Sequence, residues 1–399
     1  MSAKISFCLI SRNNEKTIED TLASIKNVAD EIIVVDTGST DKTEAIVNKF
    51  TKNIFHFKWI DDFAAARNES IKHAKHDWIF IIDADEVLDP SSIENIKNAL
   101  KTASQKKITA YQCLIHNVRG EQLYSINYMV RMLRKLDDKP FVGRIHERTS
   151  PKYKIAKSGI KIIHTGYDPS LKLPHKEAEK REKLLELDLK DNPEDINAIY
   201  NLANQYLSNK NYEKSLELLD KALAKEPNNL ELLITKADLL REQNGFASSV
   251  SILEKLLNIK EGQYLDLRPY FILGDVFYRQ KKYAEALKLY KDVFAFTPED
   301  LVRQDVTRFD IPTYFYALFQ ACYMASVQKE YQRCFKYGET LLNSPFYQEQ
   351  TIYLLFLTAI EAKDNKILVE LYEKYQEFFE KHPKAITLKG FYLQAKNAG

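Results

Sequence analysis

The sequence lacks a cysteine framework. Its four cysteines, Cys8, Cys113, Cys322 and Cys334, are scattered along 399 residues and include no Cys-x-x-Cys pair. Disulfide-rich secreted domains and zinc modules carry closely spaced cysteines, whereas isolated cysteines in a long chain are typical of reduced thiols. We therefore expect free, mostly buried thiols in a cytoplasmic protein.

The sequence also has neither a long apolar run nor a strong net charge. No stretch approaches the roughly 20 consecutive apolar residues that a membrane-spanning helix needs. The 58 lysines and arginines nearly balance the 56 acidic residues, and the formal net charge of +2 gives no overall basic field for nucleic acid. The segment Met1–Lys4 leads directly into a strand-like run, so we expect no signal peptide.

What is present changes character near residue 170. The residues before this point alternate between strand and helix patterns, which is typical of a mostly parallel α/β sheet. After His175 only helical patterns occur. We therefore expect an α/β domain over residues 1–170, a linker helix over 171–195 and an all-α repeat domain over 196–399.

Short apolar runs and helical periodicity locate the elements of the first part. Strands are predicted at 5–10, 31–35, 54–59, 78–82, 107–118 and 124–133, with an antiparallel arrangement open for the last two. Helices are predicted at 14–29, 41–50, 63–74 and from Ser91 or Ser92 to 102.

The helical half has a period of 34 residues. Small and large residues occupy the positions of a tetratricopeptide repeat in residues 196–229 and, more fully, in residues 267–300, while residues 230–262 form a weaker copy. Each helix pair buries its apolar stripe only against its neighbours, so we expect three or more pairs to stack.

Acidic residues follow the predicted strands of the first half at the points where the strands end. One apolar run leads into Asp83–Glu86, and Asp36 and Asp62 follow two earlier strands. Ligands of open α/β sheets bind at this edge, and Asp83 and Asp85 share a side of an extended chain. Their oxygens suit Mg²⁺ or Mn²⁺. Each acid alone could instead be a helix cap, but three acidic strand ends together favour a site.

Several sequence blocks occur in a specific order across this half. They are Leu9–Asn14, Ile33–Asp41, Phe63–Asn68, Asp83–Glu86, Gly143–Glu147 and Ile163–Tyr167. Together they resemble the nucleotide-sugar domain of inverting family 2 glycosyltransferases, which have the GT-A fold and an Asp-x-Asp metal motif. The resemblance covers about residues 4–168. With its tetratricopeptide-like helices, the whole chain most resembles bacterial peptide S-glycosyltransferases of the sublancin type, which attach a sugar to a cysteine of a bacteriocin precursor.

The resemblance implies a role for each matching position. Asp36 matches the acid that binds the nucleotide base, and Asp85 matches the ligand of Mn²⁺ or Mg²⁺. His164 can complete the metal shell, and His146 is a second candidate, although a lone histidine is more often structural. Further residues expected near the nucleotide sugar are Ile10, Ser11, Arg12, Asp62, Arg67, Asp83, Ala84 and Arg144, with Asp83 also beside the metal. Arg131, Arg134 and Arg144 could each clamp phosphate or lie on a solvated strand edge.

Inversion by a single displacement needs one base that takes the proton of the acceptor. Glu147, in a loop after Pro140, is the expected base, and Glu86 is the second candidate. A cysteine acceptor would ask less of this base, since a thiol of pKa ~8.5 is already partly ionised near neutral pH.

The resemblance implies a UDP-hexose donor and an acceptor that is a peptide thiol. A cell-surface saccharide or lipid-linked glycan is the rival acceptor. The helical repeats could hold the acceptor or form a homodimer, and we expect no nucleic acid partner and no transmembrane segment in this bacterial cytoplasmic protein. A non-catalytic tetratricopeptide adaptor is the alternative from another class. Nucleotidyltransferases and aspartate phosphatases are disfavoured, because Leu9–Asn14 holds neither a glycine-rich phosphate loop nor a nucleophilic Asp-x-Asp.

Overall fold

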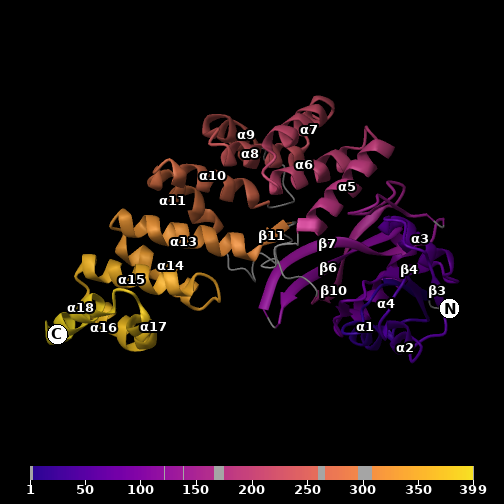
Figure 1. The fold of residues 1–399 in the computed structure, drawn as a ribbon, viewed down its shortest axis with the longest axis horizontal. Helices are drawn as coiled ribbons and strands as arrows, with labels where there is room; N and C mark the ends of the chain where they lie inside the picture. Colours follow the sequence, from indigo (N-terminus) through magenta and orange to yellow (C-terminus); the bar gives the residue numbers. More distant parts are fainter. Residues whose placement is uncertain are drawn as a thin grey trace. The chain divides into compact units, whose positions relative to one another are not determined.

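The chain folds into two compact units, residues 1–239 and residues 240–399. The structure is a computed structural model and describes residues 3–120, 122–137, 139–165, 175–258, 266–294 and 308–398 (Figure 1). All four cysteines are buried free thiols. No helix in these ranges combines the length and the apolar character that a bilayer span requires.

A mixed sheet forms the centre of the first unit (Figure 1). Its strands, in spatial order, are β3 (Ile54–His56), β2 (Glu31–Asp36), β1 (Ile5–Ser11), β4 (Trp78–Ile81), β7 (Gln122–Arg134), β6 (Ala110–Arg119), β10 (Ile155–His164) and β5 (Glu86–Leu88). The first four are parallel, whereas β7 is antiparallel to both β4 and β6. The predicted α/β class is confirmed, and the sheet is mixed: β6 and β10 are again parallel, whereas β5 is antiparallel to β10.

The pairing register of the strands brings predicted site residues at the ends of different strands close together. Ser11 lies opposite Asp36 where β1 and β2 end. β10 runs antiparallel to β5, and His164 lies opposite Glu86. The acidic segment after β4 and the late histidine therefore meet at one edge of the sheet.

Both faces of β1, β2 and β4 are buried, as a continuous apolar run predicts, whereas the edge strand β3 is only partly buried. In β1, Phe7 and Leu9 belong to one hydrophobic cluster and Cys8 to another, because alternate side chains point to opposite faces. Phe7 stacks on Phe80 with ring centroids 4.6 Å apart. The helices of this part are α1 (Ile18–Ile25), α2 (Thr43–Val47), α3 (Phe63–Lys72) and α4 (Ser92–Lys106).

The last long strand of the sheet, β10, ends at His164, and α5 begins at His175; the predicted domain boundary at residue 170 stays a prediction. The first helices nevertheless belong to the compact unit that contains the sheet. They are α5 (His175–Asp191), α6 (Ile196–Ser208), α7 (Tyr212–Lys225) and most of α8 (Leu230–Glu242). The predicted linker at 171–195 thus includes a long helix that packs with the sheet unit.

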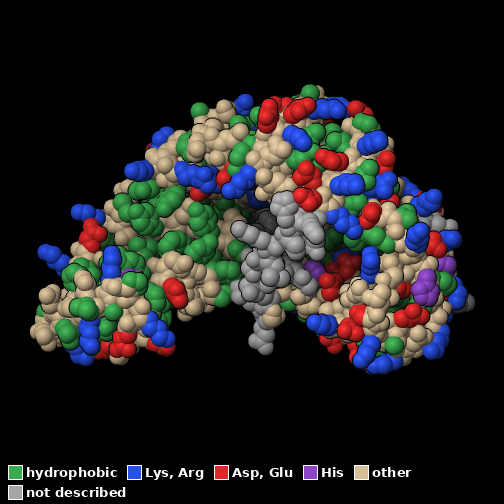
Figure 2. Space-filling model, in the orientation of Figure 1, with side chains coloured by type: hydrophobic (Ala, Val, Ile, Leu, Met, Phe, Trp, Pro, Cys, Tyr) green, Lys and Arg blue, Asp and Glu red, His purple; other side chains and the backbone are tan. Residues whose placement is uncertain are grey.

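The second unit consists mainly of paired helices. Its elements are α9 (Phe246–Asn258), α10 (Arg268–Arg279), α11 (Tyr283–Val293), β11 (Arg308–Asp310), α13 (Ile311–Val327), α14 (Tyr331–Leu342), α15 (Gln348–Ala362), α16 (Asn365–Lys374), α17 (Gln376–Lys381) and α18 (Ala385–Ala398). The predicted repeat 267–300 contains the pair α10–α11, although its last residues, including Pro298, lie outside the described part of the chain. Figure 2 shows apolar side chains gathered over α11 and α13, where Tyr316, Tyr323 and Val327 are exposed.

Candidate active site

A pocket of about 910 Å³ opens where β1 and β4 end. Predicted site residues that line it are Ile10, Ser11, Arg12, Arg67, Asp83, Ala84, Asp85, Glu86, His146, Glu147 and His164. These residues come from both ends of the sheet domain's sequence. The structure therefore gathers most of the predicted site into one cavity.

Asp36 is buried and is not among the residues that line the pocket. Its Oδ1 accepts hydrogen bonds from the backbone N–H groups of Gly38 and Ser39, at 2.8 and 2.7 Å, and Ser11 Oγ lies 3.4 Å from Oδ2. Gly38 has φ +111°, a conformation that favours glycine. Asp36 thus shapes the turn after β2, while its neighbours Ser11 and Thr37 line the cavity.

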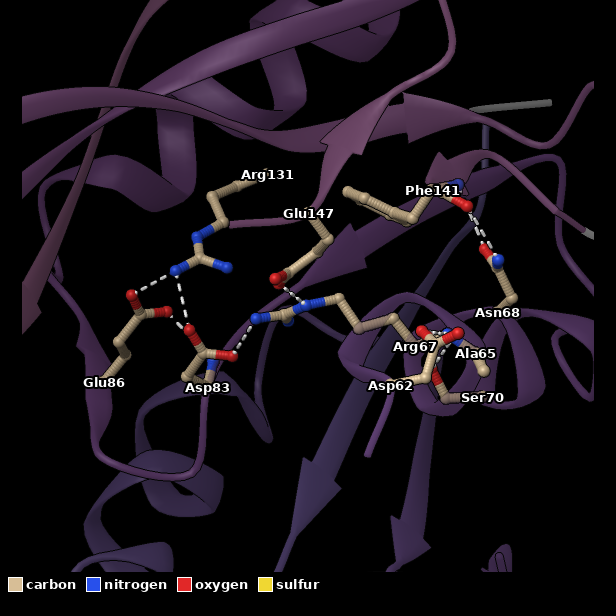
Figure 3. Close-up of polar contacts among 10 residues, drawn as sticks. All are labelled: Asp62, Ala65, Arg67, Asn68, Ser70, Asp83, Glu86, Arg131, Phe141 and Glu147. Carbon is tan, nitrogen blue, oxygen red and sulfur yellow. Dashed lines mark hydrogen bonds and ion pairs between the residues drawn. The ribbon is translucent and has the colours of Figure 1, made fainter. Parts of the chain in front are cut away.

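Asp83 lies between two buried arginines (Figure 3). Its Oδ1 lies 2.8 Å from Arg67 Nη2, and its Oδ2 accepts a hydrogen bond of 2.8 Å from Arg131 Nη2. Burial opposes ionisation, but the charges of Arg131 and Arg67 prevail and hold the pKa of Asp83 well below its usual range. Both oxygens of Asp83 face guanidinium groups, and its role beside a metal stays a prediction.

Glu86 borders the pocket but is buried beside the same cluster, with 1% of its surface exposed. It accepts hydrogen bonds from Arg131 and from the backbone N–H of Asp83. Burial raises its pKa against the opposing charge of Arg131, and the charge of Asp83 raises it further. Glu86 is therefore enclosed by protein groups, which disfavours contact with an acceptor.

Glu147 ends the loop between the short strands β8 (Phe141–Val142) and β9 (Arg148–Thr149). Its carboxylate accepts a hydrogen bond from Arg67 Nε, so that Arg67 bridges Glu147 and Asp83 (Figure 3). The Glu147 side chain is 13% exposed and lines the pocket. Of the two predicted bases, Glu147 is the more accessible.

Asp85 and His164 form a second pair in the pocket. Asp85 Oδ2 lies 3.4 Å from His164 Nε2, and His164 Nδ1 lies 2.8 Å from Asn117 Oδ1. Asn117 also donates from Nδ2 to Ser125, so its Oδ1 accepts a hydrogen bond from the Nδ1–H group of His164. Burial opposes protonation of His164, but its hydrogen bond to Asp85 and the nearby acidic charges raise its pKa. Nε2 is therefore directed toward the Asp85 carboxylate.

The pair Asp85–His164 could supply two of the ligands of a divalent cation. Within the described residues, no group of three or more His, Cys, Asp or Glu side chains is arranged to hold a metal ion. Mg²⁺ commonly takes only one or two protein ligands and completes its shell with waters and substrate phosphates. The hard oxygen of Asp85 suits Mn²⁺ or Mg²⁺ in that arrangement, and the His164 imidazole lies beside it as a candidate second ligand. His146 lines the same cavity from the loop.

Two further predicted residues, like Asp36, do not line the main pocket. Asp62 caps α3, accepting a hydrogen bond of 2.8 Å from the backbone N–H of Ala65, which is the helix-cap alternative. The Arg144 side chain binds Asp191. Asp62 and Arg144 line a separate cavity of about 660 Å³.

The pocket is also lined by residues to which the sequence assigned no definite role. Of the three arginines considered for phosphate, Arg131 lines the pocket; Arg134 is the last residue of β7, opposite Trp78. The apolar run around Arg131 is a signal that this charge is buried and paired. Lys180 and Arg181 of α5 also line the cavity. Their helix has the charged composition of a solvated surface, so the sequence carries no signal for them.

Comparison with known proteins agrees with the two-part organisation. Residues 6–144 match Glycosyl transferase family 2, and residues 206–268 match Tetratricopeptide repeat. A TPR repeat-containing protein of Synechococcus elongatus is 32% identical over 204 residues, or 48% of this chain and 50% of that protein. The SPbeta prophage-derived glycosyltransferase SunS of Bacillus subtilis is 32% identical over 171 residues, or 41% of this chain and 39% of that protein.

Among solved structures, glucosyl-3-phosphoglycerate synthase from Mycobacterium tuberculosis, in complex with Mg²⁺ and uridine diphosphate, overlaps with a TM-score of 0.26 at 25% identity. The overlap covers 28% of this chain and 44% of that one. The chain spans half or less of the length of the two curated relatives. The predicted combination of a family 2 glycosyltransferase domain with tetratricopeptide repeats is confirmed by the two family matches.

Proposed function

We propose that this chain, which carries a family 2 glycosyltransferase domain followed by tetratricopeptide repeats, transfers a hexose from a UDP-sugar to an acceptor with inversion at the anomeric carbon. One observation carries the proposal: Asp83, Asp85, Glu147 and His164 line a single cavity at the carboxyl edge of the sheet. Open α/β sheets bind their ligands at this edge.

Asp85 and His164 would hold Mn²⁺ or Mg²⁺. When bound there, the metal would neutralise negative charge on the diphosphate of the donor as the sugar leaves. Arg67 and Arg131 flank Asp83 and keep it ionised next to this position. At the nucleotide end, Ile10, Ser11, Arg12 and Thr37 line the pocket and would flank the base and ribose.

Glu147 is the proposed base. It is the more accessible of the two candidate carboxylates, and its contact with Arg67 orients it. In a single displacement it would take the proton of the acceptor as the acceptor's oxygen or sulfur bonds to the anomeric carbon. In the same step the bond between the anomeric carbon and the UDP oxygen would break, and UDP would leave from the opposite face of the sugar.

The favoured acceptor is a cysteine thiol of a bacteriocin-type peptide, held by the helical repeats. The sequence resemblance to peptide S-glycosyltransferases of the sublancin type, together with the similarity to SunS, supports this choice. A saccharide or lipid-linked glycan is the rival acceptor. A purely non-catalytic adaptor fits poorly, because an adaptor has no use for the charged cluster Arg67–Asp83–Arg131 inside a cavity of this size.

The test is UDP release from UDP-glucose and related donors by the full chain, with and without EDTA. A cysteine-bearing precursor peptide and its Cys→Ser variant serve as acceptors, and mass spectrometry detects an added hexose. Transfer to the first peptide alone supports the thiol proposal. Transfer only to a glycan acceptor assigns the rival reaction, and metal-independent binding of UDP without any turnover favours the adaptor.

A further inference from the structure

The loop Gly143–Glu147 has a backbone that its surroundings must hold in place. It joins β8 to β9, whose pairing sets Val142 opposite Arg148. His146 has φ +55°, a left-handed conformation that is unfavourable for a residue with a side chain. Such conformations persist where neighbouring contacts over-determine them. The residues that contact this loop therefore determine the orientation of the Glu147 side chain.

Helix α5 supplies the main anchor. Both carboxylate oxygens of Asp188 accept the backbone N–H of Arg144, at 2.8 and 2.9 Å, and the N–H of Ile145 also bonds to this carboxylate. Asp191, one turn further along the helix, binds the guanidinium of Arg144 at 2.8 and 3.1 Å. The helix thus fixes the backbone of the loop and not only its side chains.

The start of α6 extends the same anchor. Asp195 caps this helix and also forms an ion pair with Arg148, the residue after Glu147. Ile145 packs against the cluster of Leu185, Leu202 and Tyr206. A polar and an apolar contact therefore tie the loop to the first helices of the repeat region.

The opposite side of the loop is tied to α3. The Phe63 backbone N–H donates to the carbonyl of Arg144 at 2.8 Å, and Arg67 donates to Glu147. Because Arg67 also contacts Asp83, its side chain links the loop to the charged cluster in the pocket. The loop therefore bridges the catalytic pocket and α5.

We propose that Asp188 is a positioning residue for glycosyl transfer. By holding the backbone at Arg144 and Ile145, it directs Glu147 at the pocket, and α5 is then a working part of the active centre. The inference rests on the proposed function, since it concerns the same reaction. It predicts that disturbing Asp188 affects the chemical step more than donor binding.

The test compares Asp188→Ala and Asp188→Asn with the control Asp220→Ala. Asp220 is also a helical aspartate in an ion pair, with Lys236, but it is exposed and does not line the pocket. For Asp188→Ala we expect kcat to fall by about tenfold or more, as small misplacements of reacting groups do. The KM for the UDP-sugar and the affinity for UDP should stay within about twofold of wild type, because the donor pocket is intact. Asp188→Asn should recover part of kcat, since its amide oxygen still accepts an N–H.

Wild-type kcat in Asp188→Ala would overturn the inference. The inference would also be overturned if Asp188→Ala and Asp188→Asn both lost UDP affinity and thermal stability in parallel, because that result indicates a structural role alone. If Asp188→Ala does not fold, Asp188→Asn decides: reduced kcat with unchanged UDP affinity supports positioning, and any other result contradicts it. Turnover of the UDP-sugar by the wild-type chain is measured first. If the wild type shows none, the proposed function itself is refuted, and the variants are not compared.

Discussion

Asp85 and His164 face each other across the floor of the pocket, with Oδ2 3.4 Å from Nε2. If this pair holds the metal, Asp85→Asn should raise the concentration of Mn²⁺ needed for half-maximal activity and lower the rate by about tenfold or more, equivalent to ~1.4 kcal/mol. The measurement is a Mn²⁺ titration of UDP release at saturating donor. Glu94→Gln, on the exposed first turn of α4, is the control. An unchanged Mn²⁺ requirement in Asp85→Asn would assign the metal to other ligands.

Glu147→Gln tests the base. The amide keeps an oxygen for the Arg67 N–H but cannot take a proton, so kcat with a hydroxyl acceptor should fall by roughly 10²–10⁴-fold. With a thiol acceptor the loss should be smaller and should shrink as pH rises, because a growing fraction of the thiol ionises without help. Rates are measured across pH with the cysteine-bearing precursor peptide and with its Cys→Ser variant. A variant with wild-type kcat on a hydroxyl acceptor would remove Glu147 from this role.

Arg131 compensates two buried carboxylates, Asp83 and Glu86. Arg131→Met would leave Glu86 buried without its guanidinium partner and Asp83 paired with Arg67 alone, and we expect a loss of roughly 3–5 kcal/mol in the free energy of unfolding. The charge of Arg131 lowers the pKa of Asp83 against the effect of burial. In the variant Asp83 protonates more readily, so the destabilisation should be smaller at acid pH than at neutral pH. Urea denaturation at both values measures this, with Arg134→Met, exposed at the far end of β7, as the control.

Much of this arrangement was predictable from local sequence. The run before Asp83 showed a buried strand, and the acidic segment after it showed where ligands would bind. Pairings across long sequence distances were harder to predict, because helical or strand periodicity says nothing about partners far along the chain. Asp62 illustrates the difference: its spacing fitted both a helix cap and a nucleotide contact, and only the fold shows the cap. The contacts of α5 were missed for the same reason, since a charged helix that packs on a sheet domain resembles a solvated one.

The second unit allows a test of the repeat packing itself. A Cβ atom at Gly274 of α10 would lie 2.2 Å from the ring of Tyr290, whose hydroxyl bonds to Gln320. Gly274→Ala should therefore destabilise this unit by about 1–3 kcal/mol through overpacking. Gly390→Ala is a matched control within α18, because nothing lies within 4 Å of the added atom. The control should be neutral or stabilising by up to about 1 kcal/mol, since alanine is the better helix former. Thermal unfolding that moves equally in both variants would contradict the close approach of α10 and α11.

Arg181 gives the proposed donor site its sharpest binding test. It lines the pocket beside Lys180, and Lys180 already contacts Asp61 at 3.1 Å. If the diphosphate lies near this wall, Arg181→Gln should weaken UDP binding by about tenfold, as the loss of a charge-assisted contact does, while uridine binding stays unchanged. Calorimetry with UDP and uridine in the presence of Mn²⁺ separates the two contributions, and added salt should reduce the difference between wild type and variant. Lys190→Gln, in the last turn of the same helix, carries the same charge change away from the pocket. Equal effects of both substitutions would show only a long-range change in potential, whereas an effect confined to Arg181 places the phosphates at α5.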